Sequence, residues 1–259
     1  MARREPPSRF DLTGRVALVT GASRGLGAVM SLALAEAGAD LILWARHEGA
    51  LQRQATRCRA FGSRVLVQPV DVTRRPMVRR AVRAALKQFG RLDVLLNNAG
   101  IWGGDQALTL GGRVWNEVLE SNLTAVFFVS QAVALAMAKR RYGKIINVSS
   151  TSGVRAHEQG AAYGSSKAAL IHLTKILAAE WGPLGVRVTS IAPGLFRTDM
   201  TREEFADRVW LKRRQALVPL RRFGEPEDLA GLAIFLASPA SDHITGQTII
   251  IDGGASLTT

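Results

Sequence analysis

Short apolar runs alternate with longer helical stretches along almost the whole chain, and this alternation restricts the possible folds more than any other feature. Seven runs read as buried strands, at residues 15–20, 41–45, 64–68, 92–97, 144–149, 186–191 and 248–251. Helices are expected after the first two strands and near 74–89, 113–139, 161–181, 202–215 and 226–237. Alternating units of this length imply right-handed crossovers and a parallel sheet covered on both faces. We predict one doubly wound α/β domain over 11–259, after a disordered lead-in over 1–10.

The composition agrees with a globular domain, since 47% of the 259 residues are hydrophobic and 21% are charged. The single cysteine, Cys58, excludes an intramolecular disulfide framework and a cysteine-rich zinc site, and it fits a reducing compartment. We expect no metal site. No apolar stretch reaches the roughly 20 residues that a membrane span needs. The first ten residues lack the apolar core of a secretory signal. We therefore expect a cytoplasmic protein without a membrane partner.

The net charge of +13 raises the question of an anionic partner. The basic residues, however, are spread along the chain, with the densest runs at 74–75, 139–141 and 212–214. Aromatic residues do not interleave with them, and no nucleic-acid-reading motif accompanies them. Solvated helix faces explain this pattern, so nucleic acid is not the expected partner.

A glycine-rich turn follows the first strand and opens the first helix. Its spacing is G-x-x-x-G-x-G, which differs from the common G-x-G-x-x-G dinucleotide pattern. Glycines let a backbone turn sharply and approach a pyrophosphate, which the free N–H groups of the helix N-terminus then bind. A purely structural turn is the alternative, but the strand before and the helix after favour cofactor binding. The predicted binding residues are Gly21, Ser23, Arg24, Gly25, Leu26 and Gly27.

The end of the second strand bears on the choice of cofactor. An acid at that place hydrogen-bonds the adenosine ribose and repels a 2′-phosphate. This chain has Trp44-Ala45-Arg46 there instead. Arg46 can pair with the 2′-phosphate of NADP, and Arg24 offers a second positive charge. The alternative is that Arg46 is an ordinary surface residue. We predict a preference for NADP(H) over NAD(H).

Tyr163 and Lys167 are four residues apart, which places both side chains on one face of the helix predicted over 161–181. A tyrosine hydroxyl has a pKa of about 10, and a nearby ammonium group lowers that pKa by stabilising the phenolate. Such a pair exchanges a proton with a carbonyl or alcohol oxygen. The string Y-x-x-x-K is common by itself, so its surroundings decide its meaning.

Polar and glycine-rich features follow several predicted strands at the same edge of the sheet. Ser150 stands thirteen residues before Tyr163 at the end of the fifth strand, and Asn97-Asn98-Ala99-Gly100 ends the fourth. Asn122 lies in the helix between these strands, and residues 193–198 follow the sixth. Ligands of open parallel sheets bind outside the carboxyl ends of the strands. Core packing does not require such a pattern, so it indicates an active site.

These motifs together resemble those of the short-chain dehydrogenase/reductase family, in its single-domain branch of about 250 residues with a Rossmann-like fold. TGASRGLG, NNAG, the asparagine of SNL, S-x12-Y-x3-K and APGLFRT match in order and spacing, and the resemblance runs from about residue 10 to residue 254. It implies an NADP(H)-dependent oxidoreductase that transfers a hydride directly between nicotinamide and a carbonyl or secondary alcohol.

The resemblance also implies a role for each site residue. Tyr163 is the general acid or base, and Lys167 lowers its pKa and holds the nicotinamide ribose. Ser150 orients the substrate oxygen, and Asn122 anchors a proton relay that reaches Lys167. Besides Tyr163, Lys167 and the glycine turn, the residues that the resemblance places at the cofactor are Arg46, Asp71, Val72, Asn98, Ala99, Gly100, Pro193, Gly194, Phe196 and Thr198.

The substrate stays open at this level. We expect apolar walls from Trp102, Val154, Leu195, Phe196 and Trp210, whereas His157 and Glu158 are either polar contacts or solvated loop residues. The chain is similar both to gluconate 5-dehydrogenase-like sugar-acid and polyol enzymes and to 3-oxoacyl-acyl-carrier-protein reductases. The stretch 177–180 lacks the arginine that those reductases commonly carry, which favours a small ketone, sugar acid or polyol.

A function other than catalysis is also considered. The chain could alternatively be a family member that has lost catalysis and serves as a cofactor-sensing or nucleic-acid-binding regulator. Such a protein usually lacks one of the catalytic residues, whereas Ser150, Tyr163 and Lys167 are all present here.

The family commonly forms homotetramers, in which the helices near 113–139 and 161–181 and the C-terminal segment meet. We therefore expect a homotetramer or a dimer that acts on a small-molecule substrate.

Overall fold

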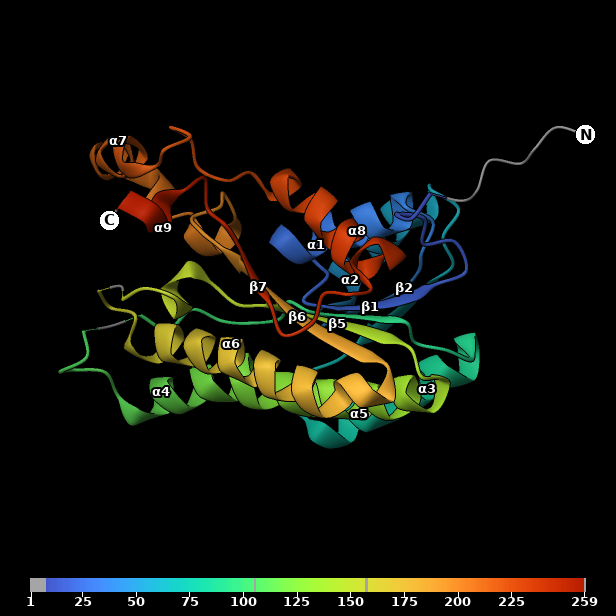
Figure 1. Cartoon of the computed structure of the whole chain (residues 1–259). Helices are drawn as coiled ribbons and strands as arrows, with labels where there is room; N and C mark the ends of the chain where they lie inside the picture. The colour runs from blue at the N-terminus through green and yellow to red at the C-terminus, as the bar shows by residue number, and fades with distance from the viewer. Residues whose placement is uncertain (1–7, 105, 157, 259) are drawn as a thin grey trace, which may run out of the picture.

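The computed structural model describes residues 8–104, 106–156 and 158–258. Its centre is a seven-stranded parallel sheet in the order β3-β2-β1-β4-β5-β6-β7 (Figure 1). The strands are β1 Val16–Thr20, β2 Asp40–Ala45, β3 Val65–Pro69, β4 Val94–Asn97, β5 Gly143–Val148, β6 Val186–Pro193 and β7 Thr248–Ile251. The predicted doubly wound α/β fold, with seven parallel strands, is confirmed.

Helices cover both faces of this sheet (Figure 1). One face carries α1 Gly25–Glu36, α2 Glu48–Arg59 and α8 Ala230–Ala237. The other carries α3 Arg75–Phe89, α4 Gly112–Leu119, α5 Ala125–Arg140 and α6 Ala161–Trp181. Two further helices, α7 Arg208–Leu217 and α9 Ala255–Thr258, lie together at one end of the molecule.

Successive side chains of each strand point to opposite faces, so the sheet separates two hydrophobic cores. Ala17 and Val19 of β1 belong to the core beneath α1, α2 and α8. Val16 and Leu18 of the same strand belong to the core beneath α3, α5 and α6. All five residues of β1 are buried, as expected of a central strand covered on both faces.

Predicted and observed strands agree to within two residues at each end, but three predicted helices differ in detail. The stretch 113–139 is two α-helices joined by a π-helical turn, Glu120–Thr124. The stretch 202–215 contains one short 3₁₀ turn, Glu204–Ala206, before α7 begins at Arg208. The Asp207 side chain caps α7 by accepting hydrogen bonds from the N–H groups of Val209 and Trp210. The stretch 226–237 opens with a 3₁₀ turn before α8.

Part of the expected disordered lead-in, residues 1–7, lies outside the described residues. Arg9 and Phe10, at its end, contact the domain: the main-chain oxygen of Arg9 accepts a hydrogen bond from the N–H of Ala240, and the ring centroids of Phe10 and Phe235 are 6.3 Å apart.

The helical run Gly112–Arg140 is long and apolar enough to cross a membrane by length and composition alone. The sequence expectation that no segment qualifies was therefore too strict. Soluble proteins have core helices of the same kind, and here Val129, Val133 and Met137 are buried in the core beneath the sheet.

The carboxyl ends of the strands meet at one edge, and strand register brings the motif residues there. Thr20 is the register partner of Trp44, Asn97 of Asn147, and Val148 of Ile191. This edge is where ligands bind in open α/β sheets. The fold thus assembles the glycine turn, the NNAG segment and the ends of β5 and β6 into one candidate site.

Candidate active site

The glycine turn between β1 and α1 is built for close approach. Gly21 and Gly25 have positive φ angles, 65° and 56°. A Cβ on Gly21 would lie 2.8 Å from Asn98 Nδ2, and one on Gly27 only 2.4 Å from the same atom. Larger residues at either position would therefore displace the end of β4 from the turn.

The side of the turn at Gly25 is open. A Cβ there would meet described atoms of Thr198 alone, at 3.9 Å. Among the described residues no side chain caps the N-terminus of α1, and its first turn contains no acid. Its N–H groups and the positive end of the helix dipole are free to bind an anion. The turn fits a cofactor pyrophosphate.

Hydrogen bonds join this turn to the NNAG segment. Thr20 Oγ1 accepts from the N–H groups of Asn98 and Ala99, each at 3.0 Å. Asn98 Nδ2 donates to the carbonyl oxygens of Thr20 and Gly21 at 3.2 and 3.3 Å. The structure therefore brings Asn98 and Ala99 beside the turn, as the sequence predicts.

One corner of the candidate site lies where β2 and β3 end. Arg46 is exposed just after β2. The bond from Val70 N–H to the Ala45 carbonyl, 2.9 Å, brings Asp71 near it. Asp71 Oδ1 accepts from the N–H and the hydroxyl of Thr73, so its carboxylate is already engaged. Arg46 is thus available to an anionic group at this corner.

Arg24, the second cation predicted for a 2′-phosphate, pairs with a carboxylate in this structure. Its guanidinium lies 3.7 Å from the carboxylate of Asp199, which also pairs with Arg202. The side chain therefore links the glycine turn to the segment after β6.

Ser150, Tyr163 and Lys167 come together at the end of β5. Lys167 Nζ lies 5.5 Å from the centre of the Tyr163 ring and donates to the Val148 carbonyl at 2.8 Å. Ser150 Oγ accepts from Ser152 N–H at 3.1 Å, and its side chain hydrogen-bonds Tyr163. Ser150 itself follows β5 by two residues. The structure thus brings together the three side chains to which the sequence analysis gives the proton transfer.

Burial is the largest influence on the pKa values of Tyr163 and Lys167. It lowers the pKa of Lys167 to about 8 because a buried ammonium loses its hydration. It raises the pKa of Tyr163, and the Ser150 hydrogen bond opposes that shift. The resemblance implies the reverse direction for Tyr163. In this structure the Lys167 ammonium is hydrogen-bonded to a carbonyl, and desolvation of the phenol decides the sign.

Asn122 is fully buried in the π-helical turn between α4 and α5. Its Oδ1 accepts from Ile101 N–H at 2.9 Å, and its Nδ2 donates to the Ile101 carbonyl at 2.9 Å and to Ser166 Oγ at 3.2 Å. A Cβ on Gly100 would lie 3.0 Å from Asn122 Oδ1 and 3.6 Å from Lys167 Nζ. Asn122 thus fixes the loop after β4 beside Lys167, and π turns often mark functional positions.

A buried polar ladder supports the site from below and was not predicted from the sequence. Asn97 Nδ2 donates to Ser130 Oγ and to Asn147 Oδ1, each at 2.9 Å. Asn147 Nδ2 donates to Thr174 Oγ1 at 2.9 Å. The ladder ties β4 and β5 to α5 and α6. The asparagines that interrupt two apolar strands, in LLNN and IINV, were the available signal.

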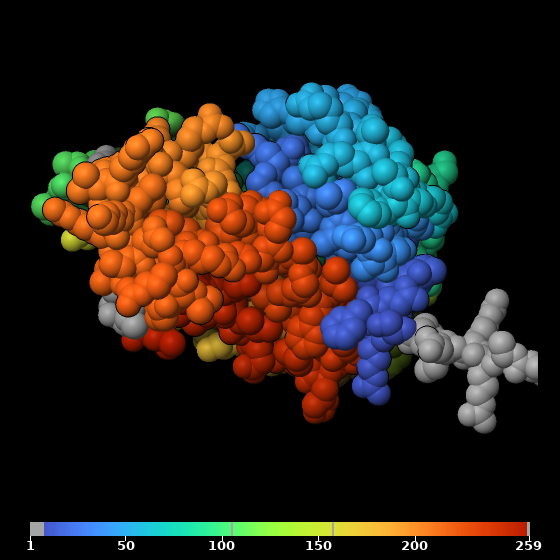
Figure 2. Space-filling model, turned by 90° about the horizontal axis from the view of Figure 1, so that it is seen from above, coloured from blue at the N-terminus to red at the C-terminus, as the bar shows by residue number. Residues whose placement is uncertain are grey.

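The segment after β6 covers one side of the site. Gly194 lies so close to Asp252 that a Cβ on Gly194 would be 2.6 Å from Asp252 Cβ. Thr198 Oγ1 is 3.2 Å from Thr201 Oγ1. A hollow of about 610 Å³ separates this segment from the glycine turn, between the orange and blue surfaces of Figure 2. Its lining residues are Gly25, Arg197, Thr198, Asp199, Arg202, Phe205 and Ala206.

The residues expected to form apolar walls of the substrate site do not all lie together. Trp102 lies beside Tyr163, with ring centroids 4.8 Å apart, and is 39% exposed. Phe196 is buried in the core beneath α1, so its side chain presents no open wall. Leu195 is partly buried and Trp210 lies on α7. Glu158 is exposed, and His157 lies outside the described residues.

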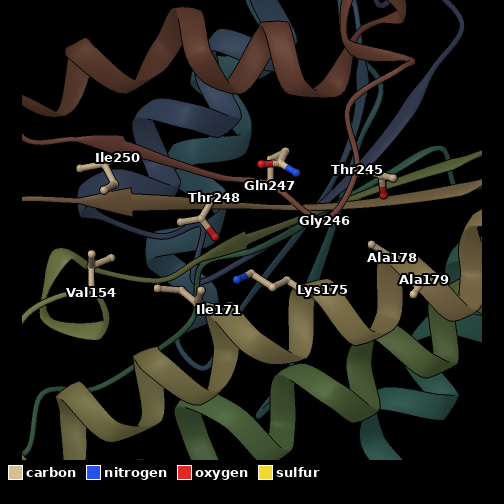
Figure 3. A pocket seen from close by; sticks show the side chains of 10 residues that line it. All are labelled: Val154, Ile171, Lys175, Ala178, Ala179, Thr245, Gly246, Gln247, Thr248 and Ile250. Carbon is tan, nitrogen blue, oxygen red and sulfur yellow. The ribbon is translucent and has the colours of Figure 1, made fainter.

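Val154, the remaining expected wall, lines another hollow of about 630 Å³ between α6 and β7 (Figure 3). The Lys175 side chain extends from α6 toward Thr248 in this hollow. Neither Tyr163 nor Lys167 lines it. Over the described part of the chain no group of three or more His, Cys, Asp or Glu residues is placed to hold a metal.

Comparisons with known proteins agree with this geometry. A family model described as enoyl-(acyl carrier protein) reductase matches residues 21–256. Gluconate 5-dehydrogenase of Gluconobacter oxydans is 38% identical over 256 residues, covering 97% of this chain and 98% of that protein. The chain belongs to the short-chain dehydrogenase/reductase family. This short-chain dehydrogenase/reductase therefore is an oxidoreductase that acts on an alcohol or carbonyl group with a nicotinamide cofactor.

Other relatives of this short-chain dehydrogenase/reductase differ in their reactions. A 3-oxoacyl-[acyl-carrier-protein] reductase of Synechocystis is 38% identical, covering 94% of this chain and 97% of that protein. The crystal structure of a gluconate 5-dehydrogenase from Burkholderia cenocepacia, in complex with NADP and tartrate, has a TM-score of 0.94 and 37% identity and covers 97% and 98% of the two chains. Solved relatives hold NADP or NAD⁺.

Proposed function

We propose that this protein is an NADP(H)-dependent reductase or dehydrogenase of a small ketone, sugar acid or polyol. The observation that carries the proposal is the meeting of Ser150, Tyr163 and Lys167 beside the open glycine turn. The bound cofactor supplies or accepts the hydride. The protein's own part is to place the substrate carbon and to move one proton.

Tyr163 holds that proton at its hydroxyl oxygen. In reduction it donates the proton to the substrate oxygen, and in oxidation it accepts one. Ser150, already hydrogen-bonded to Tyr163, donates a hydrogen bond to the same substrate oxygen and stabilises its developing charge. Lys167 binds the nicotinamide ribose, and its charge lowers the pKa of Tyr163 once the cofactor is bound. Asn122 anchors the relay that returns the proton.

The preference for NADP(H) is supported by Arg46, the exposed cation at the end of β2. Arg24 is the weaker candidate for the 2′-phosphate because Asp199 pairs with it. The remaining residues that we place at the cofactor, from Asp71 and Val72 to Pro193, Gly194 and Thr198, lie at or after the ends of strands that meet at the site edge. Dissociation constants of NADPH and NADH measured side by side test the preference.

The substrate class is tested with a carbonyl panel of 5-ketogluconate, cyclic ketones and diketones, and acetoacetyl thioesters, each with NADPH. The sugar-acid relatives support the first class, and the reductase relatives support a 3-oxoacyl thioester as the alternative. Turnover of acetoacetyl thioester alone would select the alternative. Cofactor binding without turnover of any carbonyl would favour a non-catalytic regulator.

We also propose a homotetramer, or a dimer, in the cytoplasm, with neither membrane nor nucleic acid as a partner. Large apolar side chains remain exposed on the elements expected to form the subunit contacts: Leu135 on α5 is 67% exposed, and Ile176 on α6 and Ile250 on β7 are each 41% exposed. Ile250 also lines the hollow between α6 and β7. Sedimentation equilibrium of the purified protein tests the assembly, and a monomer would contradict it.

A further inference from the structure

The indole of Trp102 lies against Tyr163 and restricts what can lie beside the proposed proton donor. The two ring centroids are 4.8 Å apart and the rings are tilted by 57°. Trp102 nevertheless keeps 39% of its surface exposed, so part of the indole remains open. A substrate whose oxygen meets the Tyr163 hydroxyl therefore has this aromatic side chain as a neighbour.

The backbone around Trp102 leaves the indole little freedom. A Cβ on Gly104 would lie 2.4 Å from indole Cζ2 and 2.5 Å from Cε2. A Cβ on Gly103 would lie 2.3 Å from Cγ2 of Val118 in α4. Two consecutive glycines thus let the loop rest directly on the indole and on α4. The ring is preorganised between the loop and Tyr163, which reduces the entropy lost on binding.

Two cations on neighbouring described segments each donate to a main-chain carbonyl. Lys167 Nζ donates to the Val148 carbonyl, and Arg155 donates to the Ala255 carbonyl at 3.1 Å. Trp102 itself carries no charge. A carboxylate set against the indole face would lose hydration and gain no charge from the indole in return, which disfavours binding there. An uncharged ring, in contrast, buries apolar surface against an aromatic face.

We propose that Trp102 determines specificity: it directs the enzyme toward ketones and secondary alcohols whose reacting carbon belongs to, or adjoins, an uncharged ring, ahead of open-chain sugar acids and acyl thioesters. This inference rests on the proposed function and narrows its substrate class.

Steady-state kinetics with NADPH test the selectivity. The ratio of kcat/KM for cyclohexane-1,2-dione to that for 5-ketogluconate is compared among the parent protein, W102A and W102F. We expect a ratio above about ten in the parent, a loss of about tenfold or more in that ratio in W102A, and partial rescue in W102F. W115A is the matched control, since Trp115 on α4 is 37% exposed, and it should keep the parent ratio.

Preference of the parent for 5-ketogluconate or acetoacetyl thioester would overturn the proposal. An equal loss on all substrates in W102A would show a structural role only and would also overturn it.

A binding measurement separates this inference from the proposed reaction. The chain has five tryptophans, so 5-fluorotryptophan labelling of the Y163F protein gives few ¹⁹F signals, and W102F assigns that of Trp102. With NADPH present, we expect cyclohexane-1,2-dione to shift the Trp102 signal saturably and 5-ketogluconate to leave it unchanged. No shift, or a shift with 5-ketogluconate alone, would overturn the inference. A saturable shift in a protein whose parent turns over no carbonyl would refute the proposed reaction and support the role of Trp102.

Discussion

The ammonium group of Lys167 donates a hydrogen bond to the main-chain carbonyl of Val148, with 2.8 Å between Nζ and O. This bond holds a cation in the buried interior at the end of β5, where Lys167 is only 4% exposed. One carbonyl replaces little of the hydration that the ammonium has in water, and the pKa of Lys167 accordingly falls to about 8. The active site therefore contains a charge whose burial opposes folding, as catalytic groups with perturbed pKa values often do.

Because burial of the Lys167 charge opposes folding, the free energies of unfolding of Lys167→Met and of the parent protein should differ by an amount that depends on pH. Below pH 8 the lysine is charged in both the folded and the unfolded protein, and the depressed folded pKa costs the parent roughly 3 kcal/mol. Between pH 8 and 10.5 the folded protein releases the proton first, so the parent gains stability as the pH rises. The free energy of unfolding of the variant minus that of the parent should fall by up to about 3 kcal/mol across this window. Urea denaturation at pH 7 and at pH 10 measures it, and a pH-independent difference would contradict the assigned burial.

Tyr163→Phe should abolish turnover and leave cofactor binding nearly intact. The substitution removes the hydroxyl that holds the proton but keeps the ring against Trp102. Loss of a general acid lowers the rate by about 10²–10⁴-fold. The measurements are NADPH oxidation with an active carbonyl and the NADPH dissociation constant. Retained turnover would show that another group exchanges the proton.

Much of the fold and of the proton-transfer group could be predicted from the sequence, because local patterns determine both. Fully apolar strand runs separated by helices require a sheet covered on both faces, and the spacing of Tyr163 and Lys167 on one helix follows from helical geometry. Strand ends then bring Ser150 and Asn98 to the same edge. These predictions needed no knowledge of long-range contacts.

The remaining features depend on contacts between distant segments. The π-helical turn at Asn122 is stabilised by Ile101 and Ser166, neither of which is a sequence neighbour. The direction of the Tyr163 pKa depends on how deeply its ring is buried, which the Tyr–Lys spacing does not determine. The segment after β6 has few buried side chains, so no periodic pattern indicates where α7 begins.

Arg46→Asp should invert the cofactor preference. A carboxylate at the end of β2 repels a 2′-phosphate and hydrogen-bonds the unphosphorylated ribose. We expect the NADPH dissociation constant to rise about tenfold to a hundredfold and that of NADH to fall or stay unchanged. Isothermal titration calorimetry with both nucleotides checks the shift. Arg53→Asp, on the exposed side of α2, is the control for the change in net charge. Equal weakening of NADPH binding in both variants would indicate a long-range effect of charge.

Gly27→Ala should lower stability and cofactor affinity together, because the added Cβ would lie 2.4 Å from Asn98 Nδ2 and 2.5 Å from the Gly21 carbonyl oxygen. The helix must move away from the end of β4, which should lower the free energy of unfolding by about 1–3 kcal/mol, and the pyrophosphate site moves with it.

Gly231→Ala is the matched helical control, since a Cβ there meets no described atom within 4 Å. Alanine at that exposed helical position should stabilise the protein by roughly 0.5–1 kcal/mol and leave NADPH binding unchanged. Thermal unfolding with and without NADPH measures both effects. If Gly27→Ala weakens the fold but keeps full NADPH stabilisation, the glycine serves helix packing alone and the turn does not position the pyrophosphate.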